Sequence, residues 1–185
     1  DGLFVRASPL PQVTVDAFAM MLKPPAWLVA DAGGGRFHNS GSYFGGLYSR
    51  LRLGKGGADL YVLGLLEDPS TAALGPQKDN NRFTVGARGF GALGGLALVS
   101  EAAFQAGKVG AAQENVVAGA FALKATYTFK SLWGAPYLLG EFSGASGDGA
   151  PGDGTEHTFH QLCPTGHAHL GYLYYVGWQN VVAGH

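Results

Sequence analysis

The amino-acid sequence predicts an all-β chain: an antiparallel up-and-down transmembrane β-barrel, or a segment of a larger one, with residues 1–185 as a single domain. Three observations predict it. Stretches rich in β-branched, aromatic and glycine residues recur between turn clusters. Their side chains alternate between polar and apolar. Short and long connections alternate along the chain, as in a barrel with one elaborated end.

About nine strands follow from this reading. Strands of about 10–12 residues, rising about 3.3 Å per residue and tilted, would cross a hydrocarbon layer, whereas a typical soluble strand has about 5–6 residues. The strands are expected near 3–7, 12–23, 41–53, 58–67, 81–90, 95–106, 115–129, 136–146 and 170–176.

The lengths of the connections indicate which strand ends lie together. The segments 8–11, 54–57, 91–94 and 130–135 are short, 107–114 is intermediate, and 24–40, 68–80 and 147–169 are long. Because an even number of strands separates the long segments, we expect all three at the same end of the sheet.

Alternation within strands assigns the two faces. In 42–53 one parity holds Ser42, Tyr48, Arg50 and Arg52, and the other holds Tyr43, Leu47, Leu51 and Leu53. The stretches 12–17, 82–88 and 123–129 split in the same way, whereas 58–66 is apolar on both parities apart from Asp59 and fits less well. A soluble antiparallel sandwich or a lipocalin-like small-ligand-binding barrel also alternates and is the alternative.

Aromatic residues stand near strand ends. Tyr43 and Phe44 adjoin a long loop, while Tyr127, Phe129 and Trp133 adjoin a short turn. Aromatic girdles gather where a membrane meets water, so this joint placement favours a membrane barrel over ordinary packing.

Charge and cysteine content exclude other classes. With 12 Lys and Arg against 13 Asp and Glu, the net charge is −1, and no global basic field indicates a nucleic-acid partner. The lone Cys163 forms no internal disulfide, and no run of 18 apolar residues predicts a transmembrane helix. The chain starts at Asp1 without a signal peptide, so we expect a mature chain or an excerpt.

Two motifs invite an enzymatic reading. Gly89, Gly91 and Gly94 spell G-x-G-x-x-G, and the residues after them would form a helix in a dinucleotide site. In a chain with 31 glycines, a tight hairpin turn is the favoured interpretation. No spacing defines a catalytic triad or dyad, so we expect no enzyme and no cofactor.

The second motif is a cluster of zinc-type ligands: His157, His160, Cys163, His167 and His169. Its spacing is irregular and no carboxylate stands in an obvious supporting position. An ordered loop that folds back on the barrel is favoured over a zinc site.

The C-terminal part, 141–180, resembles the alginate-export family of Gram-negative outer-membrane porins. The resemblance rests on EFSGASGD at 141–148, TFHQLCPTGHAHLGY at 158–172 and VGWQN at 176–180. It implies residence in the outer membrane, contact with lipid, and passage of an anionic uronate polysaccharide through a basic lumen. The family's barrel has roughly twice as many strands as are found here, so we expect other barrel segments or outer-membrane partners to complete it.

If the polar parity faces the lumen, the lumen is mildly positive. Its basic residues are Arg6, Arg50, Arg52, Arg82, Arg88 and Lys124, and its acidic residues are Asp16, Asp59, Glu101 and Glu141. Arginine forks suit carboxylates, which predicts modest selectivity for carboxylated saccharides or other organic anions. Two alternatives stay open: cross-strand ion pairs that only hold the wall rigid, and a scaffold barrel that docks partners through its long loops.

Overall fold

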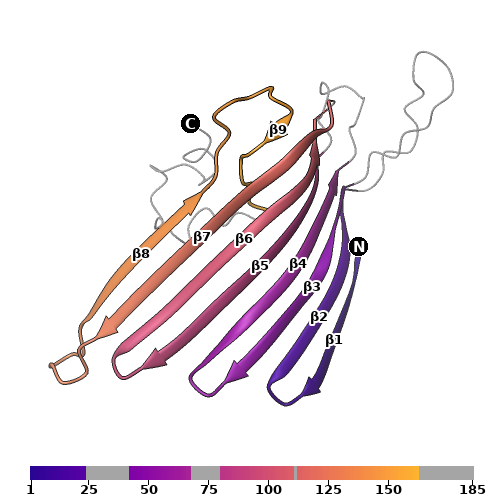
Figure 1. Ribbon diagram of the computed structural model, residues 1–185. Helices are drawn as coiled ribbons and strands as arrows, with labels where there is room; N and C mark the ends of the chain where they lie inside the picture. Colours follow the sequence, from indigo (N-terminus) through magenta and orange to yellow (C-terminus); the bar gives the residue numbers. More distant parts are fainter. Residues whose placement is uncertain (24–41, 68–79, 111, 163–185) are drawn as a thin grey trace, which may run out of the picture.

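A computed structural model describes residues 1–23, 42–67, 80–110 and 112–162. Within these ranges eight strands form one antiparallel sheet in which each strand pairs with the next along the chain (Figure 1). The strands are β1 Gly2–Leu10, β2 Val13–Lys23, β3 Ser42–Leu53, β4 Gly56–Glu67, β5 Asn80–Leu93, β6 Leu96–Val109, β7 Glu114–Thr128 and β8 Tyr137–Ala145. The predicted all-β meander is therefore confirmed for the first eight strands.

The ninth predicted strand, at 170–176, lies outside the described residues. Within the predicted long connection 147–169, the structure adds the two-residue strand β9, Thr155–Glu156, which pairs in parallel with Asn115 and Val116 of β7. A two-residue pairing leaves no alternation to detect, so no sequence pattern announced it.

The strand ends that flank the long connections lie at one end of the sheet, as expected. Lys23 pairs with Ser42, Ser42 with Glu67, and Val109 with both Asn80 and Glu114, so these strand ends share one edge. The described part of the last long connection, 146–162, leaves β8 at that same end (Figure 1).

The opposite end holds the short turns. β5 and β6 are joined there by Gly94 and Gly95, and Gly94 has a φ of 62°. That left-handed conformation is open to glycine at little cost. Gly89 and Gly91 lie within β5, and the residues after the turn form strand β6, so the helix of a dinucleotide site is absent and the hairpin interpretation is correct.

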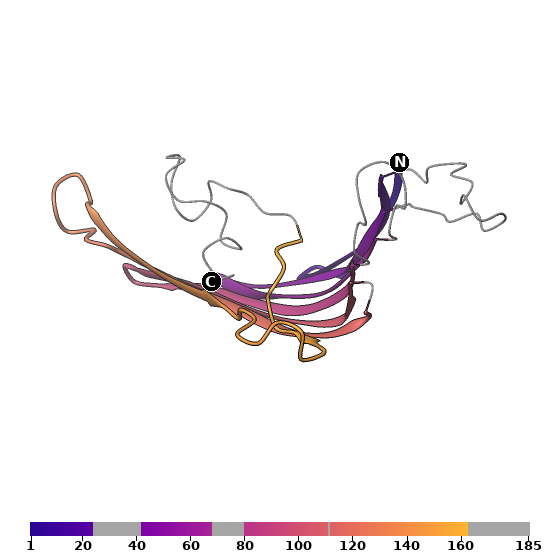
Figure 2. The same cartoon turned by 90° about the horizontal axis from the view of Figure 1, so that it is seen from above.

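The sheet is curved, and its two faces have opposite chemistry. Figure 2 shows the chain after β9 rising on the concave side. That segment bonds to Arg82 and Gln105, so the polar parity faces the concave side. The convex parity exposes large apolar residues on neighbouring strands, among them Leu47, Leu60, Val62, Phe83, Val85, Phe104, Phe121, Leu123 and Phe142.

This distribution is the inverse of a soluble domain. Among the described residues the buried hydrophobic side chains are Leu65, Val116 and Ala118, whereas Asp16, Asp59, Arg82, Thr84 and Gln105 are buried polar ones. A contiguous exposed apolar face of this extent fits lipid and not water. A soluble sandwich would bury its large apolar side chains in a core, whereas the described residues expose most of theirs on the convex face.

The aromatic placement is reproduced in part. Trp133 is fully exposed at the β7–β8 connection, and the rings of Tyr127 and Phe129 meet edge to face with centroids 4.9 Å apart. At the other rim Tyr43 lies on the convex parity, but Phe44 lies on the concave parity and packs against Phe18. Neighbouring residues in a strand point to opposite faces, so only one of that pair can contribute to a girdle.

Within the described residues the sheet stays open, because β1 and β8 each pair on one side only. An antiparallel, unclosed sheet of this kind is consistent with a barrel segment. The described residues also include no helix long and apolar enough to span a membrane.

Candidate functional site on the concave face

Two aspartates organise the basic residues of the concave face. Asp16 lies opposite Arg6 in the β1–β2 register. Its two carboxylate oxygens accept from Arg6 Nε at 2.6 Å and Arg6 Nη2 at 3.0 Å, and Arg50 Nη2 lies 3.1 Å away. Two guanidinium groups therefore share one carboxylate.

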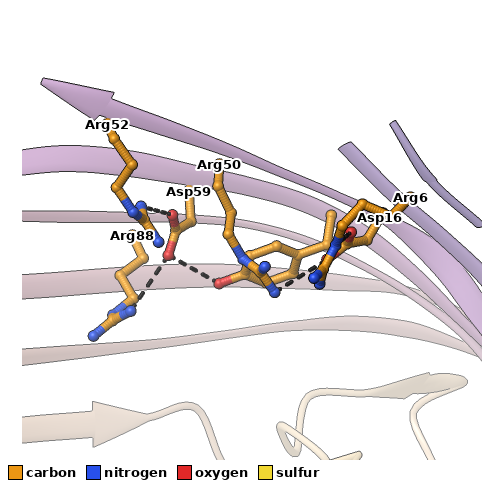
Figure 3. A network of polar contacts seen from close by, with 7 residues as sticks. Arg6, Asp16, Arg50, Arg52, Asp59 and Arg88 are labelled. Atoms are coloured by element: carbon orange, nitrogen blue, oxygen red, sulfur yellow. Dashed lines mark hydrogen bonds and ion pairs between the residues drawn. The ribbon is translucent and has the colours of Figure 1, made fainter. Parts of the chain in front are cut away.

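The second centre repeats this stoichiometry. Asp59 lies between Arg50 of β3 and Arg88 of β5 in the register. Its oxygens accept from Arg52 Nη1 at 2.7 Å and from Arg88 Nη1 at 3.3 Å, and the Tyr48 hydroxyl donates to it at 3.0 Å. Figure 3 shows the two centres side by side. We call Arg6, Asp16, Arg50, Arg52, Asp59 and Arg88 the arginine cluster.

Burial within the arginine cluster is unequal. The side chains of Asp16 and Asp59 are 4% and 1% exposed, whereas the four arginine side chains are 35–52% exposed. The carboxylates therefore lie beneath their partners, and the exposed surface of the arginine cluster is made of guanidinium groups. A buried carboxylate needs such partners, because an unpaired buried charge is costly.

Aromatic rings hold the arginines in place. The rings of Tyr48 and Tyr61 stack with centroids 5.6 Å apart and planes 4° apart. Arg50 Cζ lies 5.1 Å from the Tyr48 ring centroid, and Arg52 Cζ lies 4.7 Å from that of Phe90. Cation–π contacts of this kind favour a fixed guanidinium position.

Arg82 has a different environment from the other arginines. It is 5% exposed and donates to the Asn80 side chain at 2.7 Å and to the Thr158 carbonyl oxygen at 3.1 Å. Thr158 belongs to the segment 155–162, which we call the strap. The structure thus separates Arg82 from the four other arginines that the sequence analysis placed on the polar face.

Side chains of β6 and of the residue after β8 hold the strap through hydrogen bonds to its backbone. Gln105 is fully buried; its Nε2 donates to the His160 carbonyl oxygen at 2.7 Å, and its Oε1 accepts from the His160 amide at 2.8 Å. The Ser146 hydroxyl donates to the His157 carbonyl oxygen at 2.6 Å. The Gln105 side chain thus acts as a strand partner for one residue of the strap.

The remaining candidate residues lie elsewhere on this face. Lys124 Nζ is 3.9 Å from a carboxylate oxygen of Glu141, its register partner. Glu101 lies opposite Arg88 in the register and accepts from the Tyr61 hydroxyl at 2.6 Å.

The histidines of the predicted loop take part in strap contacts. His157 Nδ1 lies 2.9 Å from the Val117 carbonyl oxygen. Burial and the nearby Arg82 lower the pKa of His160. Over the part of the chain that the structure describes, no group of three or more His, Cys, Asp or Glu is arranged to hold a metal. Cys163, His167 and His169 lie outside it.

Sequence reasoning missed Tyr61, Gly86 and Gln105. Tyr61 shares the parity of Asp59, and Gln105 shares that of Glu101, so the alternation rule itself would have placed both on the polar face. Gly86 offered no such signal, because it is one of 31 glycines and has no side chain that could mark a polar or an apolar face.

A curved antiparallel sheet with an apolar convex face and a charged concave face is typical of a segment of an outer-membrane β-barrel protein. The alginate export family model matches residues 35–185, so the chain belongs to that family. The family consists of outer-membrane transport proteins for polysaccharide export. No curated protein and no solved structure matches the chain.

Proposed function

We propose that the concave face lines part of an export pore in the outer membrane of a Gram-negative bacterium, and that the pore passes anionic solutes, carboxylated saccharides foremost. The observation that carries the proposal is the unequal burial in the arginine cluster: buried aspartates beneath exposed guanidinium groups. A carboxylate that approached the arginine cluster would meet guanidinium donors before it met the oxygens of Asp16 or Asp59.

The charge ratio supports modest selectivity. Four arginines share two aspartates, which leaves an excess of two positive charges in the arginine cluster. Rings of arginine or lysine side chains select anions in pores, and the planar guanidinium matches a carboxylate in a two-bond geometry. Because every arginine is partly occupied by an aspartate, binding would be weak enough for the solute to move on.

Reversal potentials across a salt gradient, measured on the full-length protein in planar bilayers, test the proposal. The variant Arg50→Ala, Arg52→Ala and Arg88→Ala combined should lose most of the anion preference. Lys108→Ala is the matched control, since this exposed lysine bonds to Gln113 and Asn115 at the loop end and lies outside the arginine cluster. Cation preference in the unmodified protein, or an unchanged potential in the triple variant, contradicts the proposal.

A further inference from the structure

Glu101 and Arg88 are directly opposed but not paired. They are register partners on β5 and β6, where opposite charges ordinarily form a cross-strand pair. Among the described residues, no ion pair within 4.0 Å joins them. Arg88 instead reaches Asp59 at 3.3 Å, on the strand to its other side.

Glu101 is hydrogen-bonded to Tyr61 instead of Arg88. The tyrosine hydroxyl donates to Glu101 Oε1 at 2.6 Å, although Tyr61 belongs to β4 and Glu101 to β6. The tyrosine side chain therefore crosses the whole of β5. A bond from a hydroxyl to an ionised carboxylate at this length is among the strong hydrogen bonds.

Gly86 makes the crossing feasible. It is the register partner of Tyr61 on β5. A Cβ built at Gly86 would overlap the Cζ and hydroxyl atoms of Tyr61, so the ring lies over bare backbone. The Tyr48 ring stacks on Tyr61 with nearly parallel planes, and Arg50 lies against Tyr48. The ring is thus enclosed between a glycine and a second aromatic residue.

From this geometry we infer that Tyr61, admitted by Gly86, is a positioning residue that keeps Glu101 from neutralising Arg88, and so sets how strongly this part of the wall attracts anions. The inference deepens the proposed function and rests on it for its effect on selectivity. The exchange of partners is a separate, directly measurable event.

Tyr61→Phe tests the inference with the smallest change, because the ring and its stacking stay while the donor is lost. The freed Glu101 carboxylate should pair with Arg88, and the reversal potential should move toward the cation side, as far as Arg88→Ala moves it. Gly86→Ala should give the same shift by displacing the ring. Tyr61→Phe with Glu101→Gln should restore the anion preference, since a neutral amide does not offset Arg88.

An infrared measurement separates this inference from the proposed function. The carboxylate stretch of Glu101, identified from the difference spectrum with Glu101→Gln, should shift in Tyr61→Phe and shift differently when Arg88→Ala is added. An anion-selective protein in which Tyr61→Phe changes neither the potential nor this band overturns the inference. A protein without anion preference in which the band shifts as expected overturns the proposed function and upholds the exchange of partners.

Discussion

Arginine side chains are exposed in one region of the concave face and buried in another. In the arginine cluster the carboxylates are buried and the guanidinium groups are exposed. Beneath the strap the guanidinium of Arg82 is itself buried, and its donors are taken by Asn80 and by the Thr158 carbonyl oxygen. Arg82 and Arg88 share one strand and one face, yet Arg82 anchors a chain segment and Arg88 is partly exposed beside Asp59.

The parity of a residue in its strand therefore does not by itself decide whether its side chain is exposed on the concave face. What lies above the side chain decides its role, and here the difference is the strap. Its bonds to Gln105 bridge 55 positions of sequence. The two regions should therefore respond to substitution independently, since changes at distant sites without shared partners are usually additive.

Gln105→Ala should have the largest effect on the strap region. It removes both bonds to His160 and the bond to Thr84, and the lost bonds of a buried amide correspond to about 1–3 kcal/mol. Hydrogen exchange at the amides of Phe159 and His160 should accelerate by about tenfold or more, since about 1.4 kcal/mol corresponds to a factor of ten. Gln105→Glu should also accelerate exchange, because its buried carboxylate would face the His160 carbonyl oxygen without a donor between them. Unchanged exchange in Gln105→Ala would mean that the β9 pairing alone holds the strap.

Measuring Arg82→Ala beside Arg52→Ala tests most directly whether the two regions are independent. Loss of the Arg82 donor to Thr158 should accelerate strap exchange several-fold and leave the permeability ratio of the pore nearly unchanged. Loss of Arg52, which is about half-exposed beside Asp59, should lower the anion preference and leave strap exchange unchanged. If both variants change both readouts, the regions form one coupled network.

Acidification should loosen the strap through His160. Burial lowers the pKa of His160 most, the Arg82 guanidinium lowers it further, and the Glu67 carboxylate raises it. The docked strap therefore binds fewer protons than the released one. Docking should be strongest above the ordinary histidine pKa of about 6.5 and weaken as the pH falls through the lowered value.

Hydrogen exchange of the strap, corrected for its intrinsic pH dependence, measures this loosening. His160→Leu should abolish it, and the neighbouring His157→Gln should not, because His157 reaches the Val117 carbonyl from an exposed position. A pH response that survives His160→Leu would assign the titration to another group.

The sequence was sufficient for the sheet but not for the division of its inner face. Strand length, alternation and the order of short and long connections predicted about nine strands, and the first eight of these are confirmed. Each of these signals is local, and alternation repeats every two residues. The strap contacts and the Tyr61–Glu101 bond join residues tens of positions apart, and no periodicity encodes them. The poor fit of 58–66 has the same origin: its concave parity holds Tyr61, which reads as apolar but donates to a carboxylate.

Lys124→Ala, at a third position on the concave face, should have the smallest effect on stability and reversal potential. Lys124 lies 3.9 Å from Glu141, is about half-exposed, and contacts neither the arginine cluster nor the strap in the described residues. An exposed pair of this kind contributes about 0–1 kcal/mol and is screened by salt. The variant should therefore unfold at nearly the same denaturant concentration as the unmodified protein. Its reversal potential should shift less than in any single variant of Arg50, Arg52 or Arg88. Lys124 contributes one weakly held, half-exposed ammonium group that lies outside the arginine cluster. A shift as large as that of Arg52→Ala would show that selectivity follows total lumen charge and not the arginine cluster.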